Sequence, residues 1–202
     1  MSHLICLSPD EVETRLEKLG IPVRFAAWER KVLKTIPVVD NLRPIFGFPL
    51  PEDNIKLNLF NLKAVCGGNP SKPPSFFDHS WYEHEDFMRV PCGPGWHFVH
   101  MDVLPGSIEQ PLNYSSRLEG LGLELPSAIE VVLMLFLHFT ETGEQLLLKK
   151  HTWCSDEASL GRAVTVGAFG RNGVFISSHP PAFSSRGLGI CGKVRQQADH
   201  AG

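Results

Sequence analysis

Apolar residues recur every three or four positions through the first third of the chain, which is the spacing of amphipathic helices. The clearest case is segment 8–20. Ser8 suits an N-cap, Glu11 follows three residues later as in a capping box, and Gly20 can adopt the left-handed conformation that ends a helix. The apolar stripe of this predicted helix consists of Val12, Leu16 and Leu19.

Two further helices are predicted before residue 67, over residues 24–35 and 54–65. Between them, prolines at positions 44, 49 and 51 indicate a turn-rich connection. The side chains expected to face inward are Phe25, Trp28, Val32 and Ile36 in the first helix, and Leu57, Phe60, Leu62 and Val65 in the second.

The pattern changes near residue 75. Segment 67–75 is a linker by its content of proline and glycine, and short alternating runs typical of strands follow it. A turn at 170–173 contains Asn and Gly and predicts a hairpin. The predicted strands are 87–90, 96–104, 145–154, 162–169, 173–178 and 188–194.

One strong helix, 128–142, interrupts these strands. Ser127 and Glu130 form a second capping box, Gly143 follows the helix, and nearly every side chain from 129 to 139 is apolar. Such a helix is expected to be buried against a sheet. The sequence therefore predicts an α+β fold, with N-terminal helices followed by a mostly antiparallel sheet packed on one buried central helix. We expect a single domain over 1–202, made of a helical part (1–66), the linker (67–75), an α+β core (76–194) and a mobile tail (195–202).

Composition narrows the class of protein. The chain has 202 residues, of which 43% are hydrophobic and 20% charged, so it can bury a core. A net charge of -3 argues against a nucleic-acid partner, because phosphate binding needs a basic excess. The longest apolar stretch, 128–139, is shorter than the ~20 residues of a membrane span. The five cysteines are odd in number and include no C-x-x-C pair, which predicts free thiols and a cytoplasmic protein.

The loop 76–86 (F-F-D-H-S-W-Y-E-H-E-D) is the first candidate site. Aromatic rings beside carboxylates and imidazoles can stack a ligand while polar groups orient it. The alternative is that the aromatic residues cover the edge of the sheet and the charges face water. The candidate binding residues are Phe77, Asp78, His79, Trp81, Tyr82, Glu83 and His84.

The second candidate is His100 and Asp102, which alternation places on one face of a predicted strand. With a distant histidine, for which His179 is the candidate, they match a site of two histidines and one carboxylate around a metal. The pattern resembles that of iron- and 2-oxoglutarate-dependent oxygenases, and Arg186 could then hold a substrate carboxylate. The chain departs from that family because it predicts about six strands and not a complete double-stranded barrel. The alternative is a histidine hydrogen-bonded to its neighbour on the strand.

Other reactive side chains are predicted to be structural. Cys92 and Cys154 lack a well-placed base, Glu130 is explained by its capping box, and His138 is expected to be a satisfied core histidine. We therefore expect a ligand- or partner-binding module that is not an enzyme and uses the loop 76–86, for an unknown protein or small molecule. The alternative is a metal-dependent enzyme that uses the His-x-Asp pair to bind non-haem iron or zinc. Under this alternative the expected cofactor is a divalent metal ion. Neither nucleic acid nor membrane is an expected partner.

Overall fold

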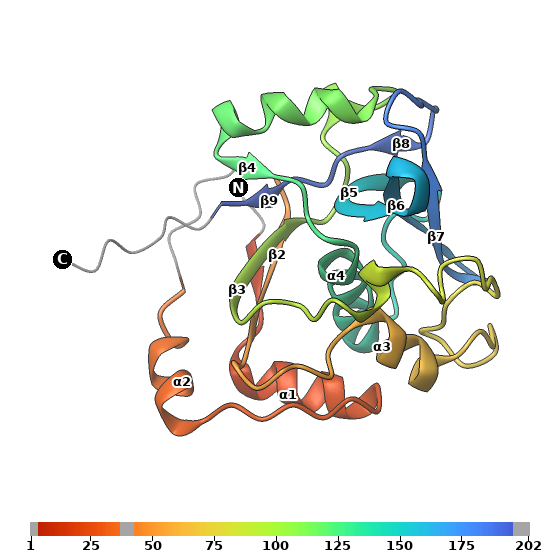
Figure 1. The fold of residues 1–202 in the computed structure, drawn as a ribbon. Coiled ribbons are helices and arrows are strands. Elements are labelled where there is room, and N and C mark those ends of the chain that lie inside the picture. The colour runs from red at the N-terminus through yellow and green to blue at the C-terminus, as the bar shows by residue number, and fades with distance from the viewer. Residues whose placement is uncertain (1–3, 37–42, 196–202) are drawn as a thin grey trace.

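Two sheets enclose one helix. The computed structural model describes residues 4–36 and 43–195, and the strands within these residues form sheets of order β1-β2-β3-β9-β4 and β7-β6-β5-β8. Helix α4 (Ala128–Thr142) lies between them and contacts β3 of the first sheet and β5 and β6 of the second (Figure 1). The α+β fold class predicted from the sequence is confirmed, but two sheets pack on the helix where one was expected. The predicted tail 195–202 lies, apart from its first residue, outside the described residues.

The first sheet collects strands from both ends of the chain. Its pairs are antiparallel except β1 with β2, which run parallel. Val99 of β3 pairs with Lys193 of β9, so a residue near the C-terminus lies beside the middle strand. The strands are β1 (Leu4–Cys6), β2 (Ile45–Leu50), β3 (Gly95–His100), β9 (Lys193–Val194) and β4 (Leu123–Glu124).

The second sheet is built around consecutive hairpins. The predicted turn at 170–173 joins β6 to β7, with Gly170 paired to Gly173, and β8 adds to β5 in parallel. The predicted run 188–194 is divided between the two sheets, because β8 and β9 are two short strands. The strands are β5 (His151–Ala158), β6 (Arg162–Gly170), β7 (Gly173–His179) and β8 (Leu188–Gly189).

Strand β2 contradicts the turn-rich connection predicted between residues 44 and 51. All six of its residues are buried, and it includes Pro49. Gly47 accepts a hydrogen bond from Leu7 N, so the backbone groups of 47 and, by alternation, of 49 point toward β1. Because β1 pairs only with residues 45–47, Pro49 lies beyond its end and no ladder hydrogen bond is lost.

Helices α1 (Pro9–Lys18) and α4 confirm the two predicted capping boxes. In each, the N-cap serine accepts a hydrogen bond from the third helical residue, and that glutamate accepts one from the serine backbone. Gly143 ends α4 with a φ of 69°, as expected for a left-handed cap. Both helices therefore begin where the local sequence indicates.

The other two N-terminal helices are shorter than predicted, and their exposed faces differ from those expected. Helix α2 (Ala27–Val32) leaves Trp28, Val32 and the following Ile36 exposed, although Phe25 is buried. Helix α3 (Leu59–Cys66) buries Leu62 with the preceding Leu57. Its predicted inward residues Phe60 and Val65 are exposed.

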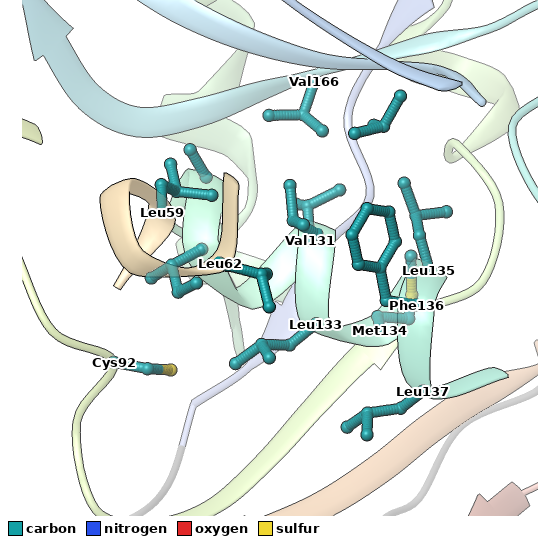
Figure 2. Close-up of a cluster of buried hydrophobic side chains, with 14 of the residues drawn as sticks. Leu59, Leu62, Cys92, Val131, Leu133, Met134, Leu135, Phe136, Leu137 and Val166 are labelled. Carbon is teal, nitrogen blue, oxygen red and sulfur yellow. The ribbon is translucent and has the colours of Figure 1, made fainter. Parts of the chain in front are cut away.

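The core surrounds α4. Figure 2 shows apolar side chains of this helix between Leu59 and Leu62 of α3 on one side and Val166 of β6 on another. Every residue of α4 from Ala128 to His138 is buried. Its two interior polar residues are satisfied, since His138 Nε2 lies 2.9 Å from a Glu144 carboxylate oxygen and Glu130 is described below.

Two predicted stretches of strand are absent. Residues 86–89 form a 3-10 turn where strand 87–90 was expected, and β3 ends at His100 where 96–104 was expected. Further 3-10 turns at 105–107, 112–117 and 119–121 lead to β4. None of the helices formed by the described residues has both the length and the apolar character needed to cross a bilayer.

Candidate ligand-binding cleft

A cleft of about 1150 Å³ opens where the N-terminus of α4 meets β3, β4 and β9. One part of its lining is apolar and includes Val90, Pro94 and Trp96. The 3-10 turn at 112–117 supplies hydroxyl and amide groups, and charged side chains also line the cleft. The polar lining residues are Asn113, Ser115, Ser116, Glu119, Glu124, Ser127, Ser155, Lys193 and Arg195.

Glu130 is a buried residue of the cleft lining. One carboxylate oxygen accepts hydrogen bonds from Ser127 N at 2.7 Å and Ser127 Oγ at 3.0 Å, which is the capping box. The other oxygen lies 2.7 Å from His97 Nδ1 and 2.9 Å from Lys193 Nζ. Glu130 therefore joins the start of α4 to β3 and β9, which are far apart in the sequence.

The protonation of Glu130 follows from these partners. Burial alone would raise its pKa, but the hydrogen bond and charge of His97, with the charge of Lys193, lower the pKa from 4.5 to about 2. Glu130 is thus a carboxylate at neutral pH. Burial would lower the pKa of Lys193, yet Glu130 and Glu124 outweigh it and raise that pKa, so the ammonium also keeps its charge.

His97 uses both ring nitrogens inside this network. Nδ1 faces the Glu130 carboxylate, and Nε2 lies 2.8 Å from the carbonyl oxygen of Gly93. Both ring nitrogens are therefore engaged within the network. The ring also stacks on Phe48 of β2, with centroids 5.2 Å apart. His97 consequently fixes the turn 91–95, which forms part of the cleft wall.

Two cations and two further carboxylates complete the electrostatics. Lys193 Nζ lies 2.9 Å from both Glu124 and Glu130, and Arg195 Nη1 lies 3.0 Å from Glu119. The Arg195 side chain is 46% exposed, so part of its guanidinium faces the opening. The lining charges nearly balance, which favours a polar ligand of low net charge over a polyanion.

Cys92, His97 and Glu130 together could hold a metal ion by ligand type and separation, and no other such group occurs within residues 4–36 and 43–195. The contacts do not favour this use. Both ring nitrogens of His97 are already hydrogen-bonded, Nδ1 with Glu130 at 2.7 Å and Nε2 with the Gly93 carbonyl oxygen at 2.8 Å, so an ion would have to displace one of these bonds. Lys193 also places a positive charge on the carboxylate that an ion would need.

Cys92 is a structural thiol in this arrangement. Its Sγ lies 3.9 Å from His97 Nε2, but the side chain is buried and lies among the apolar residues of the core (Figure 2). Burial, with the charge of Glu130, raises its pKa well above 9.0, so the thiolate is strongly disfavoured. Cys154 is similarly buried with a raised pKa. All five cysteines are free, as the sequence predicts.

The predicted binding loop 76–86 lies elsewhere, against β7. Phe77 N donates to Val174 O, and the Phe77 ring packs on Phe175 with centroids 5.1 Å apart. Trp81 Nε1 donates to Ile176 O at 3.1 Å. Tyr82 is buried; Phe77, Trp81 and Glu83 are half-buried; Asp78, His79 and His84 are exposed.

These contacts resemble the alternative in which the aromatic residues cover a sheet. The Glu83 carboxylate is also occupied, since it accepts a hydrogen bond from Lys63 Nζ at 2.8 Å. A ligand-binding role for this loop stays a prediction.

The predicted metal ligands His100, Asp102 and His179 do not form a group within ligand distance of one another. Because β3 ends at His100, strand alternation does not extend to Asp102, whose carboxylate instead pairs with Lys150 Nζ at 2.6 Å. His100 Nδ1 donates to Gly192 O at 2.6 Å. His179 belongs to β7 of the other sheet, where its Nε2 lies 3.0 Å from Ser177 Oγ. Arg186, the expected clamp, is 98% exposed and faces Glu109.

Comparison of the chain with protein-family models, with curated proteins and with solved structures finds no match. The site is therefore described by its own geometry alone. Sequence reasoning missed the cleft because its central residues come from three distant segments, and because the capping box accounts for only one of the two oxygens of Glu130.

Proposed function

We propose that the protein is a ligand-binding protein without catalytic activity and that its ligand occupies the cleft beside Glu130. The observation that carries this proposal is the size and lining of the cleft. At about 1150 Å³ it can hold a small organic molecule, and its lining combines hydroxyl and amide groups with apolar side chains. We infer a polar, nearly neutral ligand with one apolar face.

Binding is favoured over catalysis because the proton-transferring groups are already engaged. Both nitrogens of His97 have hydrogen-bond partners, and the four donors around Glu130 use both of its oxygens. Neither group is left to accept a proton from a substrate. A general acid or base needs a hydrogen-bonding position open to the reacting atom.

The cleft suits a ligand better than the loop 76–86 does, because aromatic side chains of the loop already pack against β7. Tyr82 is only 1% exposed, and the indole of Trp81 already donates to a backbone carbonyl. In the cleft, by contrast, the side chains of Ser115 and Asn113 form no ion pair or hydrogen bond with another described residue. They can therefore bond a ligand without breaking an existing contact.

A cleft-blocking pair of variants tests the proposal. A Cβ at Gly93 meets no atom within 4 Å, so Gly93→Phe places a ring in the cleft without a backbone clash. Gly120→Phe is the matched control, because a Cβ there is equally unhindered and Gly120 is not part of the lining. Ser116→Trp adds a large ring at another lining position and serves if Gly93→Phe proves unstable.

The measurement is a thermal-shift screen with sugars, nucleosides, amino acids and small carboxylic acids, followed by calorimetry of the hits. We expect at least one class to raise the Tm of the natural protein and of Gly120→Phe, and not of Gly93→Phe or Ser116→Trp. Hits that stabilise all variants equally would place the site elsewhere. A screen without any stabilising class would refute the proposal.

The alternative, a metal-dependent enzyme, now rests on Cys92, His97 and Glu130, because these residues alone gather ligand atoms among the described residues. Elemental analysis of untagged protein, with and without chelator, decides between the two. We expect no stoichiometric zinc or iron. A bound metal that is lost in His97→Ala would favour the enzyme.

A further inference from the structure

An unbroken row of ion pairs runs along the lining of the cleft. Arg195 Nη1 lies 3.0 Å from Glu119 Oε1, and its Nε lies 3.8 Å from Glu124 Oε2. Lys193 Nζ lies 2.9 Å from both Glu124 Oε1 and Glu130 Oε1. Carboxylates and cations therefore alternate over side chains that all line the cleft. We call these five residues, Glu119, Arg195, Glu124, Lys193 and Glu130, the ion-pair row.

The outer part of the ion-pair row is accessible from solvent. The side chains of Glu119, Arg195 and Glu124 are 74%, 46% and 38% exposed. Those of Lys193 and Glu130 are only 20% and 5% exposed. A ligand in the cleft can therefore bond the outer three side chains without opening the buried network around Glu130.

The alternation of charge selects among ligands. An anion placed on Arg195 also meets Glu119 and Glu124, and a cation placed on either carboxylate also meets Arg195. A hydroxyl group carries no charge, and its one oxygen both donates and accepts a hydrogen bond. It can donate to a carboxylate and accept from the neighbouring guanidinium while their ion pair stays closed. Two hydroxyl groups on adjacent carbons therefore match the ion-pair row better than a charged group does.

The apolar part of the lining distinguishes a sugar ring from a nucleoside. Val90 and Pro94 are exposed, and their aliphatic side chains can pack against the C–H groups of a sugar ring. Trp96 and His97, the aromatic side chains among the described lining residues, are only 7% and 5% exposed. A nucleobase binds by stacking on an open aromatic face, which these two buried rings do not offer.

We propose that the cleft binds a carbohydrate whose vicinal hydroxyl groups bond the outer ion-pair row and whose C–H groups pack on Val90 and Pro94. The inference rests on the proposed function, because it names the chemical class of ligand for the same cleft. A nucleotide or a sugar acid is disfavoured, because its phosphate or carboxylate would face Glu119 and Glu124.

Ligand-observed NMR detects even weak binding of single sugars. The natural protein is screened by saturation transfer against methyl glycosides of the common hexoses and pentoses and against their disaccharides, and calorimetry gives the Kd of each ligand found. Derivatives that lack one of two adjacent hydroxyl groups should bind about 10-fold more weakly, because each hydroxyl bonds charged side chains. Since the ligand is neutral, its Kd should change less than about 2-fold between low and high salt.

A pair of double variants locates the binding. Glu119→Gln with Arg195→Gln removes the outermost ion pair and leaves neither charge of that pair behind, and it should raise the Kd about 10-fold or more. The matched control is Glu109→Gln with Arg186→Gln, which removes an exposed ion pair outside the lining and should leave the Kd unchanged. Because both pairs lie at the surface, each Tm should stay within about 3 °C of that of the natural protein.

The contrary outcomes separate this inference from the proposed function. The carbohydrate assignment is wrong if no sugar binds, if loss of a vicinal hydroxyl has no effect, or if Glu119→Gln with Arg195→Gln binds as the control does. A sugar that binds Gly93→Phe as tightly as the natural protein lies outside the cleft, which also overturns the assignment. If the thermal-shift screen instead finds amino acids, nucleosides or carboxylic acids that Gly93→Phe excludes, the proposed function stands and the carbohydrate assignment alone fails. A cleft that binds neither a sugar nor another screened class overturns both.

Discussion

Replacement of Glu130 by glutamine removes a buried carboxylate on which four donors converge. The side chain of Glu130 is 5% exposed, and its donors come from the N-cap of α4, from β3 and from β9. The amide introduced by Glu130→Gln retains one oxygen for Ser127, but its NH₂ group then faces His97 and Lys193, which are donors themselves. The substitution is therefore expected to leave His97 Nδ1 and Lys193 Nζ without an acceptor on this side.

The magnitude follows from the pKa of Glu130. A folded-state pKa of about 2 against the ordinary 4.5, at about 1.4 kcal/mol per pH unit, corresponds to about 3 kcal/mol of stability at neutral pH. Loss of one partner from a buried ion pair has a similar cost, about 3–5 kcal/mol. For a small domain this is a large part of the free energy of unfolding.

The pH dependence gives a second, independent test. Because the pKa is lower in the folded than in the unfolded protein, the contribution of Glu130 is fully present above pH 4.5 and is lost as the pH falls toward 2. It should therefore fall from about 3 kcal/mol at pH 7 to about 2 kcal/mol at pH 3.5. The difference between the natural protein and Glu130→Gln should shrink by the same amount.

Urea unfolding followed by tryptophan fluorescence, at pH 7, 5 and 3.5, measures both effects. Glu11→Gln is the matched control. Glu11 holds the same capping position on α1 and, among the residues that the structure describes, bonds Ser8 alone, with its backbone N and Oγ each at 2.7 Å. At that exposed site we expect a loss below about 1 kcal/mol. If Glu130→Gln costs no more than Glu11→Gln, or if its cost is the same at every pH, the buried network does not stabilise the fold as described.

Three other outcomes are expected. Phe136→Ala, in the centre of α4, should lower the free energy of unfolding by about 3–5 kcal/mol in urea titrations, because it leaves a cavity in the core. Gly167→Ala should lower the free energy of unfolding by more than about 3 kcal/mol, because a Cβ at this position overlaps the backbone of Lys150 and His151. Gly93→Ala is the control and should change the free energy of unfolding by less than about 0.5 kcal/mol, because a Cβ there meets no atom within 4 Å. Burial raises the pKa of the Cys92, Cys154 and Cys191 thiols, so iodoacetamide at pH 8 should leave all three unmodified in the native protein. In urea the reagent should alkylate them, which mass spectrometry measures. Modification of Cys92 in the native protein would contradict its assignment as a structural thiol.

The elements that could be predicted from the sequence are those specified by neighbouring residues. Helices α1 and α4 each begin with a serine and a glutamate three residues later, and all partners in that motif lie within one turn. The hairpin between β6 and β7 is similarly local, with its turn at 170–173. Local chemistry is therefore sufficient to place both kinds of element.

Strand β2 and the exposed face of α2 could not be predicted because tertiary contacts determine them. Prolines usually exclude a strand, and Pro49 is tolerated only because β1 ends before it. The spacing of Trp28 and Val32 correctly indicates a helix, which ends before Ile36, but it does not say what the apolar face contacts. The prediction that this face packs into the core is wrong, because the face lies at the surface.

Glu130 shows why the site itself was missed and how it could have been found. A capping box uses one carboxylate oxygen, and at Glu11 the other is free to meet water because the residue is exposed. Segment 129–139 is so apolar that Glu130 had to be buried, and a buried carboxylate oxygen requires donors of its own. That requirement predicts cationic or imidazole partners from outside the helix, although it cannot identify them, since His97 and Lys193 lie 33 and 63 positions away along the chain. A glutamate that caps a fully apolar helix is thus evidence of a buried polar network, and here that network forms part of the cleft lining.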